Sequence, residues 1–210
     1  MKNSKLFTIY ILLFVFGTAI YFYPLLPQTI ASHWDATGMV NGYMDKFWGL
    51  FLLPILMLVF TGVFYLIPKI DPRKENIEKF EGTYEYFILV FNLFMGYLYI
   101  LTILWNLHYK INVTGALIPA LAFLFYFSGS LIGKAKRNYM IGIKTPWTLA
   151  NDTVWDKTHK IGEKLFKLTG VITLLGLFYI QYALWFLLVP LIVTVIYLFF
   201  YSYFEYQKVK

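Results

Sequence analysis

Long hydrophobic runs, separated by short polar segments, occupy most of this 210-residue chain. A bilayer-spanning helix needs about 20 consecutive apolar residues, and the first four runs have about that length. The fifth run is about twice as long, so it fits two spanning helices joined near its most polar point, at Gln181, Tyr182 and Ala183. The runs are Leu6–Leu26, Phe47–Ile67, Tyr84–Leu107, Gly115–Gly133 and Leu165–Phe204. The pattern predicts an all-α, polytopic integral membrane protein with six transmembrane helices.

The composition supports a membrane protein and excludes several kinds of site. Hydrophobic residues make up 60% of the chain and charged residues 14%, whereas soluble domains have about 45–50% and about 25%. The chain has no cysteine, which excludes a disulfide framework, a thiolate metal site and a cysteine nucleophile. The first run follows Lys2 and Lys5, as in a signal peptide, but it is longer than the roughly 7–15 apolar residues of such a peptide. It is therefore expected to remain as a signal anchor.

Positive charges are distributed unequally between the two sets of loops. Of the 18 Lys and Arg residues, only Lys46 and Lys110 fall on the side of the first loop. Because cytoplasmic loops carry an excess of Lys and Arg, both termini are expected in the cytoplasm and the protein in the plasma membrane. The net charge of +7 follows from this bias and suits contact with anionic lipid headgroups. No basic domain outside the membrane flanks indicates nucleic-acid binding.

The outer loop, Pro27–Lys46, is rich in turn-forming residues. Asp35–Gly38 and Asn41–Gly42 are natural turn sequences, and Asn41–Gly42 is expected to close a small hairpin. Three residues are a weak alternative set of metal ligands, because their spacing does not repeat: His33, Asp35 and Asp45. The preferred interpretation is a structured outer cap with aromatic residues at the membrane interface: Trp34, Tyr43 and Trp48.

The longest polar segment, Asn138–Gly162, lies between two hydrophobic runs on the predicted cytoplasmic side. Pro146 disfavours helix at the residue before it, so the first part is expected to be extended or turned. Asn151 or Asp152 can cap a helix that begins near Thr153, and this helix is expected to lie at the cytoplasmic membrane interface. Apolar residues then recur every three or four positions and are expected to form a membrane-facing stripe: Val154, Trp155, Thr158, Ile161, Gly162 and Leu165.

Another face of this helix carries residues that could bind a divalent metal or raise the pKa of a histidine: Asp152, Asp156, His159 and Glu163. The preferred interpretation is a solvated face. Asp156 with Lys160, and Glu163 with Lys167, are acid-to-base pairs four residues apart, which are common on exposed helices. Neither a metal nor another cofactor is therefore expected.

The chain lacks the usual signs of an enzyme or an ion-coupled carrier. Proton-driven carriers place ionisable residues at membrane depth, and none lies near the midpoint of a predicted span. Motifs such as Gly-x-Ser-x-Gly and His-Glu-x-x-His are absent. Two alternatives to a non-enzymatic role stay open. One is a small-molecule transporter or exporter with helices kinked at Pro54, Pro119 and Pro190. The other is a membrane enzyme working at Asp152, Asp156 and His159.

Two segments together resemble one known family. The inner segment is similar to the signature of the SdpI immunity-protein family, which usually has Arg at the position of Lys144. It carries Asn138, then Gly142-Ile143-Lys144-Thr145-Pro146-Trp147-Thr148-Leu149, Val154-Trp155 and Thr158-His159. The outer segment is similar to the N-terminal companion membrane domain of unknown function, which often has Asp at the position of Asn41. It carries Pro27, His33-Trp34, Gly38, Asn41-Gly42-Tyr43, Lys46 and Pro54.

The resemblance covers nearly the whole chain and implies both an architecture and a function. It implies a two-helix membrane domain over residues 1–68 and a four-helix membrane domain over residues 84–210, with the signature loop at residues 134–164. Characterised relatives protect a cell from a secreted antimicrobial peptide, the sporulation-delaying toxin. In that system the immunity protein also acts as a receptor that holds a small DNA-binding repressor at the membrane. The expected role is therefore membrane immunity, with signalling as a second role.

The two segments are expected to do different work. Outer residues are expected to face the peptide: His33, Trp34, Gly38, Asn41, Gly42, Tyr43 and Lys46. The inner signature is expected to form a structured, partner-facing element: Asn138, Gly142, Ile143, Lys144, Thr145, Pro146, Trp147, Thr148, Leu149, Trp155 and His159. Within it, Trp147 and Trp155 are expected to anchor the loop at the membrane interface. Thr145 and Pro146 are expected to fix its turn, and Lys144 to face lipid phosphates or an acidic partner.

Overall fold

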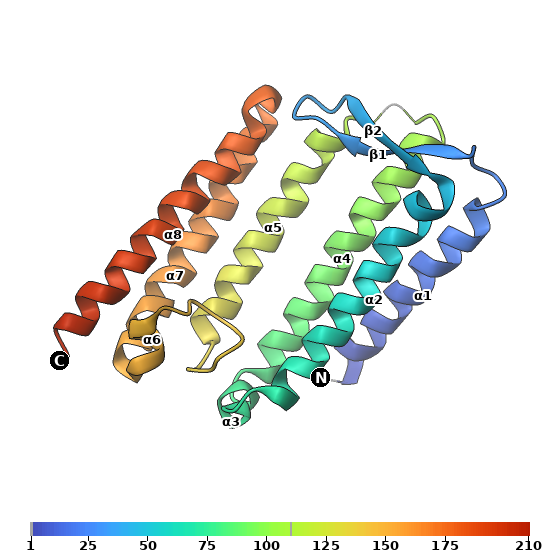
Figure 1. Cartoon of the computed structure of the whole chain (residues 1–210). Coiled ribbons are helices and arrows are strands. Elements are labelled where there is room, and N and C mark those ends of the chain that lie inside the picture. The colour runs from blue at the N-terminus through green and yellow to red at the C-terminus, as the bar shows by residue number, and fades with distance from the viewer. Residues whose placement is uncertain (1, 110) are drawn as a thin grey trace.

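The computed structural model describes residues 2–109 and 111–210, and most of them lie in long helices (Figure 1). The long helices are α1 (Lys2–Phe22), α2 (Lys46–Ile70), α4 (Glu81–Asn106), α5 (Val113–Lys134), α7 (Asp152–Thr173) and α8 (Ala183–Gln207). The short ones are α3 (Lys74–Glu78), α6 (Pro146–Ala150) and the 3₁₀ turns η1 (Leu174–Leu177) and η2 (Ile180–Tyr182). Strands β1 (Thr29–Trp34) and β2 (Val40–Asp45) complete the structure.

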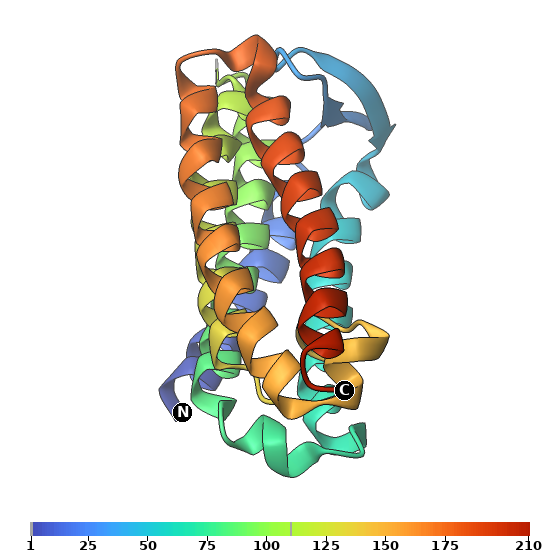
Figure 2. The same cartoon turned by 90° about the vertical axis from the view of Figure 1, so that its left-hand side faces the viewer.

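Five of the described helices are long and apolar enough to cross a membrane: α1, α2, α4, α5 and α8. This mostly helical architecture fits the predicted polytopic membrane protein. The helix α7 does not qualify, because charged residues recur along it as far as Lys167. It nevertheless runs beside α5 and α8 (Figures 1 and 2). A sixth span and the orientation of the termini therefore stay predictions.

The helix α7 also differs from the expected arrangement around residue 165. The sequence suggested a short interfacial helix followed by a separate spanning helix, whereas one continuous helix covers both. The capping prediction is confirmed, because the side-chain oxygen of Asn151 accepts hydrogen bonds from the amides of Thr153 and Val154. The chain then turns through η1 and η2, and α8 begins at Ala183, which is one of the predicted break residues.

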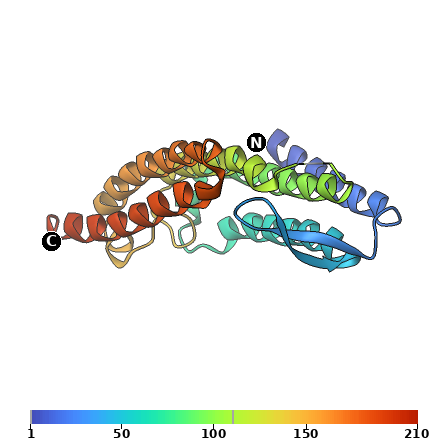
Figure 3. The ribbon, with the colours of Figure 1, turned by 90° about the horizontal axis from the view of Figure 1, so that it is seen from above.

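The helices form two groups that meet at α4 and α5. The first group, α1, α2 and α4, shares a core with the start of the hairpin; representative residues are Val15, Leu50, Met57, Tyr99 and Ile30. The second group consists of α5, α7 and α8. Seen from above, the helices form an elongated layer, with the hairpin in front of one half (Figure 3). Both termini and the loop before α7 lie at the end of the layer opposite the hairpin (Figure 1).

Glycine allows α5 and α7 to pack unusually closely. A Cβ atom added at Gly129 of α5 would lie 2.8 Å from the carbonyl oxygen of Glu163. A Cβ added at Gly170 of α7 would lie 2.5 Å from the carbonyl oxygen of Ala122. Helices in membranes associate through such small-residue contacts, because lipid supplies no hydrophobic force between them. These two glycines therefore set the spacing of the second helix group.

The hairpin corrects the all-α prediction and its predicted turn. Strands β1 and β2 pair antiparallel, but Asn41 and Gly42 lie within β2 instead of closing the hairpin. The turn lies instead at Asp35–Gly38, the other turn sequence recognised in this loop, where the carboxylate of Asp35 accepts hydrogen bonds from the amides of Thr37 and Met39. Gly38 in this turn has a φ of 87°, which glycine adopts readily. The hydrogen bonds of the Asp35 side chain thus place the turn before β2, although Asn41 and Gly42 also favour a turn.

Candidate functional site

The outer cap, defined as residues 27–46, is fixed onto the ends of α4 and α5 by side chains of those helices and of the loop between them. The Asn106 amide bonds both backbone groups of Ala31, accepting from its N–H at 2.8 Å and donating to its C=O at 3.0 Å. The Asn112 amide donates to the carbonyl of Thr37, and the Thr114 hydroxyl donates to the carbonyl of Asp35 at 2.8 Å. The cap is therefore a positioned element of the fold and not a free loop.

The predicted outer residues fall into structural and exposed sets. Gly38 lies so close to the Asn112 side chain that a Cβ would collide with it. Lys46 lies over the ring of Tyr23, with 4.7 Å between Nζ and the ring centroid. Gly42 packs against His33, whose ring nitrogen Nδ1 forms a hydrogen bond with the side-chain oxygen of Asn41. Tyr43 is 64% exposed. The exposed side chains of this set are His33, Asn41 and Tyr43.

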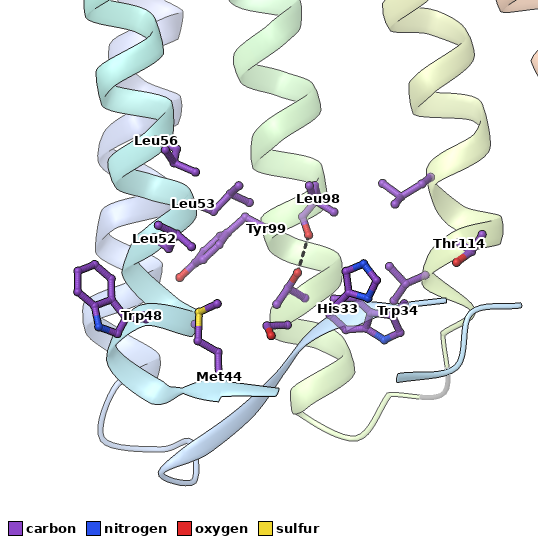
Figure 4. Close-up of a pocket in the computed structure, with 15 residues that line it drawn as sticks. His33, Trp34, Met44, Trp48, Leu52, Leu53, Leu56, Leu98, Tyr99 and Thr114 are labelled. Atoms are coloured by element: carbon purple, nitrogen blue, oxygen red, sulfur yellow. Dashed lines mark hydrogen bonds between the residues drawn. The ribbon is translucent and has the colours of Figure 1, made fainter. Parts of the chain in front are cut away.

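Beneath the cap lies a cavity of about 360 Å³, called the outer pocket below (Figure 4). It is lined by β1, the end of β2, and the outer ends of α2, α4 and α5. His33 and Trp34 line it, as does Tyr99 of α4. Trp34 also packs edge-on against Trp105, with 5.9 Å between the centroids. The sequence pointed to His33 and Trp34 but missed Tyr99, because an apolar helix position carries no local sign of a pocket.

On the opposite face, the loop between α5 and α6 is organised by Asn138. Its side-chain oxygen accepts from the amides of Met140 and Ile141, and its amide nitrogen donates to the carbonyls of Lys136 and Ile141. Gly142 then takes a φ of 119°, which L-residues rarely adopt. This turn directs the amide of Ile143 to the Nε2 atom of His159, 2.9 Å away. We call residues 135–151 the inner loop.

Trp155 and His159 form the buried support of the inner loop. Their rings stack with 3.9 Å between centroids, and they are 0% and 1% exposed. The Trp155 indole donates to the carbonyl of Ala135 at 2.8 Å. Because Nε2 of His159 accepts from Ile143, its Nδ1 carries the proton and donates to the carbonyl of Trp155. Trp155 is thus a core residue, and its predicted place at the membrane interface is wrong.

The orientation of α7 follows from the same packing. The stripe predicted to face the membrane faces the protein instead, with Val154, Trp155, Thr158 and Gly162 buried. The Cβ that a side chain would add at Gly162 lies 2.4 Å from the Ile143 side chain. The apolar periodicity was correctly recognised, but the surface that covers it is the inner loop and its neighbouring helices.

Thr145 and Thr148 form a capping box at the start of α6. A short helix therefore begins at Pro146, where the sequence led us to expect a simple turn. The hydroxyl of each threonine accepts a hydrogen bond from the other's backbone amide, and Pro146 starts the helix. Thr145 also bonds Ser202 of α8 at 2.9 Å. Trp147 packs edge-on against two rings of α8, those of Phe199 and Tyr203. The segment containing Leu149 is therefore held against α8.

The acidic residues considered for a metal are held apart by basic partners. Asp152 lies 2.6 Å from Nε of Arg137, and Asp156 lies 3.2 Å from Nζ of Lys136. The predicted pair of Asp156 with Lys160 is therefore wrong, whereas the pair of Glu163 with Lys167 is confirmed. Among the described residues, no group of three or more His, Asp or Glu side chains is arranged to hold a metal ion.

The pKa of His159 is lowered, whereas the sequence suggested that neighbouring carboxylates could raise it. Burial lowers it from 6.5 to about 4, outweighing the hydrogen bond to the Trp155 carbonyl and the charge of Asp156, which both raise it. The positive charge of Lys136 makes a smaller contribution to the same lowering. His159 is therefore neutral at physiological pH, as its acceptor role toward Ile143 requires.

We expect the protein to lose stability as the pH falls from about 6.5 toward about 4. The pKa of His159 is lower in the folded than in the unfolded protein, so its contribution is complete above the unfolded value and disappears as protonation proceeds. The loss is at most about 3 kcal/mol. Thermal unfolding of wild type and His159→Gln, measured in detergent between about pH 7 and about pH 4, checks this. The stability difference should shrink with acidification; parallel pH profiles would contradict it.

Comparison with known proteins places both candidate sites inside matched regions. Residues 134–203, which contain the whole inner loop, match the SdpI/YfhL protein family. Residues 10–58, which contain the outer cap, match a domain of unknown function (DUF1648). The chain is 25% identical to the Immunity protein SdpI of Bacillus subtilis (strain 168) over 99% of its own length and 98% of that protein. No solved structure matches it. The predicted resemblance to the SdpI family is thereby confirmed, and it extends over both faces of the protein.

Proposed function

We propose that this chain is a plasma-membrane immunity protein that protects its cell from a secreted antimicrobial peptide. The observation that carries the proposal is its end-to-end similarity to the Immunity protein SdpI. A similarity limited to a few spanning helices would not support a shared role, because apolar helices resemble one another by composition. Here both polar faces, the outer cap and the inner loop, lie in matched regions.

In this proposal the outer cap faces the side from which the peptide arrives. Nearly all cations fall on the other side, where the positive-inside tendency places the cytoplasm. The cap lies at the opposite end of the bundle from both termini (Figure 1). The peptide would therefore meet the outer end of the bundle, which carries the cap and the outer pocket, before it meets the inner loop.

The inner loop is proposed to present a surface to a cytoplasmic partner, such as a repressor held at the membrane. Most signature residues are used to fold the loop, including Asn138, Gly142, Trp155 and His159. The signature residues that remain exposed are Lys144 and Pro146, and only Lys144 is charged. Its Nζ donates a hydrogen bond only to the carbonyl of Met140 among the described atoms. Lys144 is thus the signature residue best suited to contact an acidic partner or a lipid phosphate.

Survival of a peptide-sensitive strain tests the proposed immunity. Cells that express this chain should grow at doses of the sporulation-delaying peptide that kill cells carrying an empty vector. A membrane protein of similar size, expressed to the same level, serves as the control for nonspecific protection. Equal killing of both cultures would contradict the proposal. Peptide exported from preloaded vesicles would instead favour the transporter alternative.

Lys144→Ala is expected to reduce protection about two- to fivefold without lowering the amount of folded protein. The side chain is exposed, so its loss leaves the packing of the loop intact, whereas its charge is removed from the partner surface. Lys144→Arg keeps the charge and should protect like wild type. Lys160→Ala is the matched control, since Lys160 is an exposed cation on α7 outside the signature. Protection should be scored against protein level by immunoblot, and equal scores for Lys144→Ala and Lys160→Ala would refute this role.

A further inference from the structure

Two buried tyrosines on α4 have hydroxyl groups in different states. Tyr84 is 3% exposed, and its hydroxyl donates to the carbonyl of Phe64 at 2.9 Å. Tyr99 is 1% exposed, and its hydroxyl has no hydrogen-bond partner among the described residues. Leaving a buried hydroxyl unpaired costs about 1–3 kcal/mol, so proteins rarely keep one without a use. The Tyr99 hydroxyl therefore requires an explanation that packing alone does not give.

The unpaired hydroxyl belongs to a residue that lines the outer pocket. Figure 4 shows the Tyr99 side chain reaching from α4 toward α2, among the leucines of the pocket wall. Trp34 lines the same pocket, and its indole Nε1 is also buried and without a partner among the described residues. Both groups are hydrogen-bond donors. The pocket thus combines an apolar wall with two donors that lack acceptors.

The lining indicates what kind of molecule fits. No Lys, Arg, Asp or Glu side chain belongs to the described lining, so the pocket is unsuited to an ion. Its wall includes Leu52, Leu56 and Leu98, which favour an apolar group. Its volume of about 360 Å³ lies near the lower end of the roughly 300–1,000 Å³ of small-molecule pockets. That volume suits one or two apolar side chains better than a two-chain lipid.

We infer that the outer pocket receives an apolar side chain of the secreted peptide, while Tyr99 and Trp34 donate hydrogen bonds to backbone carbonyls beside that side chain. The inference rests on the proposed function and names the part of the protein that recognises the peptide. A peptide segment supplies an apolar side chain that fits the apolar wall, and next to it backbone carbonyls that can accept hydrogen bonds from the two unpaired donors. The outer cap holds the pocket at the end of the bundle that such a peptide reaches first.

Binding of the sporulation-delaying peptide to the full chain in lipid nanodiscs tests the inference. Tyr99→Phe removes one donor and should weaken binding about two- to tenfold. Because it also removes an unpaired buried group, it should not lower the thermal unfolding temperature. Tyr84→Phe is the matched control: it breaks an existing hydrogen bond, so it should lower that temperature and leave peptide affinity unchanged.

A second pair of variants separates the pocket from the helix surface. Leu98→Trp fills the pocket and should weaken binding more than about tenfold, because overpacking leaves no room for the incoming side chain. Leu93→Trp makes the same change at an exposed position of α4 and should bind like wild type. Equal affinity of Leu98→Trp and Leu93→Trp, or no binding by wild type, would overturn the inference.

The remaining outcomes show whether a lipid occupies the outer pocket, and whether the proposed function or only the inference is wrong. Native mass spectrometry that finds a lipid on wild type and Leu93→Trp, but not on Leu98→Trp, would show that lipid occupies the pocket and would overturn the inference. Failure of the proposed function would appear as no protection by wild type. Failure of the inference alone would appear as full protection by both wild type and Leu98→Trp.

Discussion

Gly142→Ala is expected to lower the free energy of unfolding by about 2–5 kcal/mol and to release the inner loop. Gly142 has a φ of 119°, which strains any residue with a side chain. An added Cβ would also lie 2.4 Å from Nε2 of His159, the atom that accepts the hydrogen bond from Ile143. Strain and collision therefore act on the same support of the loop.

Thermal unfolding in detergent measures the global effect, and trypsin cleavage after Lys144 measures the release of the loop. Gly82→Ala is the matched control, because a Cβ at Gly82 in α4 meets nothing within 4 Å. That variant should be as stable as wild type or more stable by about 0.5–1 kcal/mol, as expected for Ala in place of helical Gly. If both variants unfold and are cleaved alike, His159 and Gly142 do not support the loop as described.

Gly170→Val is expected to destabilise the protein by about 3 kcal/mol by forcing α5 and α7 apart. The added Cβ would lie 2.5 Å from the carbonyl oxygen of Ala122 and 2.9 Å from the amide nitrogen of Tyr126. Both are backbone atoms in a helix, so neither can rotate away, unlike a flexible side chain. The whole of α5 must shift, and the close contact at Gly129 is lost with it.

The displacement can be measured directly because the chain contains no cysteine. Spin labels on cysteines introduced at Phe123 of α5 and Leu168 of α7, which are both exposed, report the distance between the helices. Gly62→Val is the control, since a Cβ at Gly62 meets nothing within 4 Å. An unchanged label distance and unfolding temperature in Gly170→Val would show that the close packing does not hold the second helix group together.

The spanning helices were the most predictable part of the fold, because a bilayer requires long apolar segments. The hairpin turn was less predictable. Asn41 and Gly42 favour a turn locally, but the Asp35 side chain organises a different turn, which Asn112 and Thr114 then hold in place. Those partners lie more than seventy positions along the chain, so no local pattern reveals them.

The sequence named many residues of the inner and outer sites, but not how they pack, for a related reason. Periodicity showed that Val154, Trp155 and Thr158 share a helix face, but it did not show what covers that face. The inner loop folds back over it, and His159, which was assigned to the polar face, became part of the core. Tyr99 was missed because its role depends on residues that the fold brings beside it.

The inner loop also accepts support from outside its own matched region. The Asp71 carboxylate accepts a hydrogen bond from the amide of Tyr139, 68 positions away, and the Asn76 side chain donates to the carbonyl of Arg137. Both supporting residues lie between the two matched segments. Recombination that exchanged the N-terminal part between relatives would succeed only if this connecting stretch travelled with the C-terminal part. In the structure the linker is thus a component of the inner face, although neither matched region includes it.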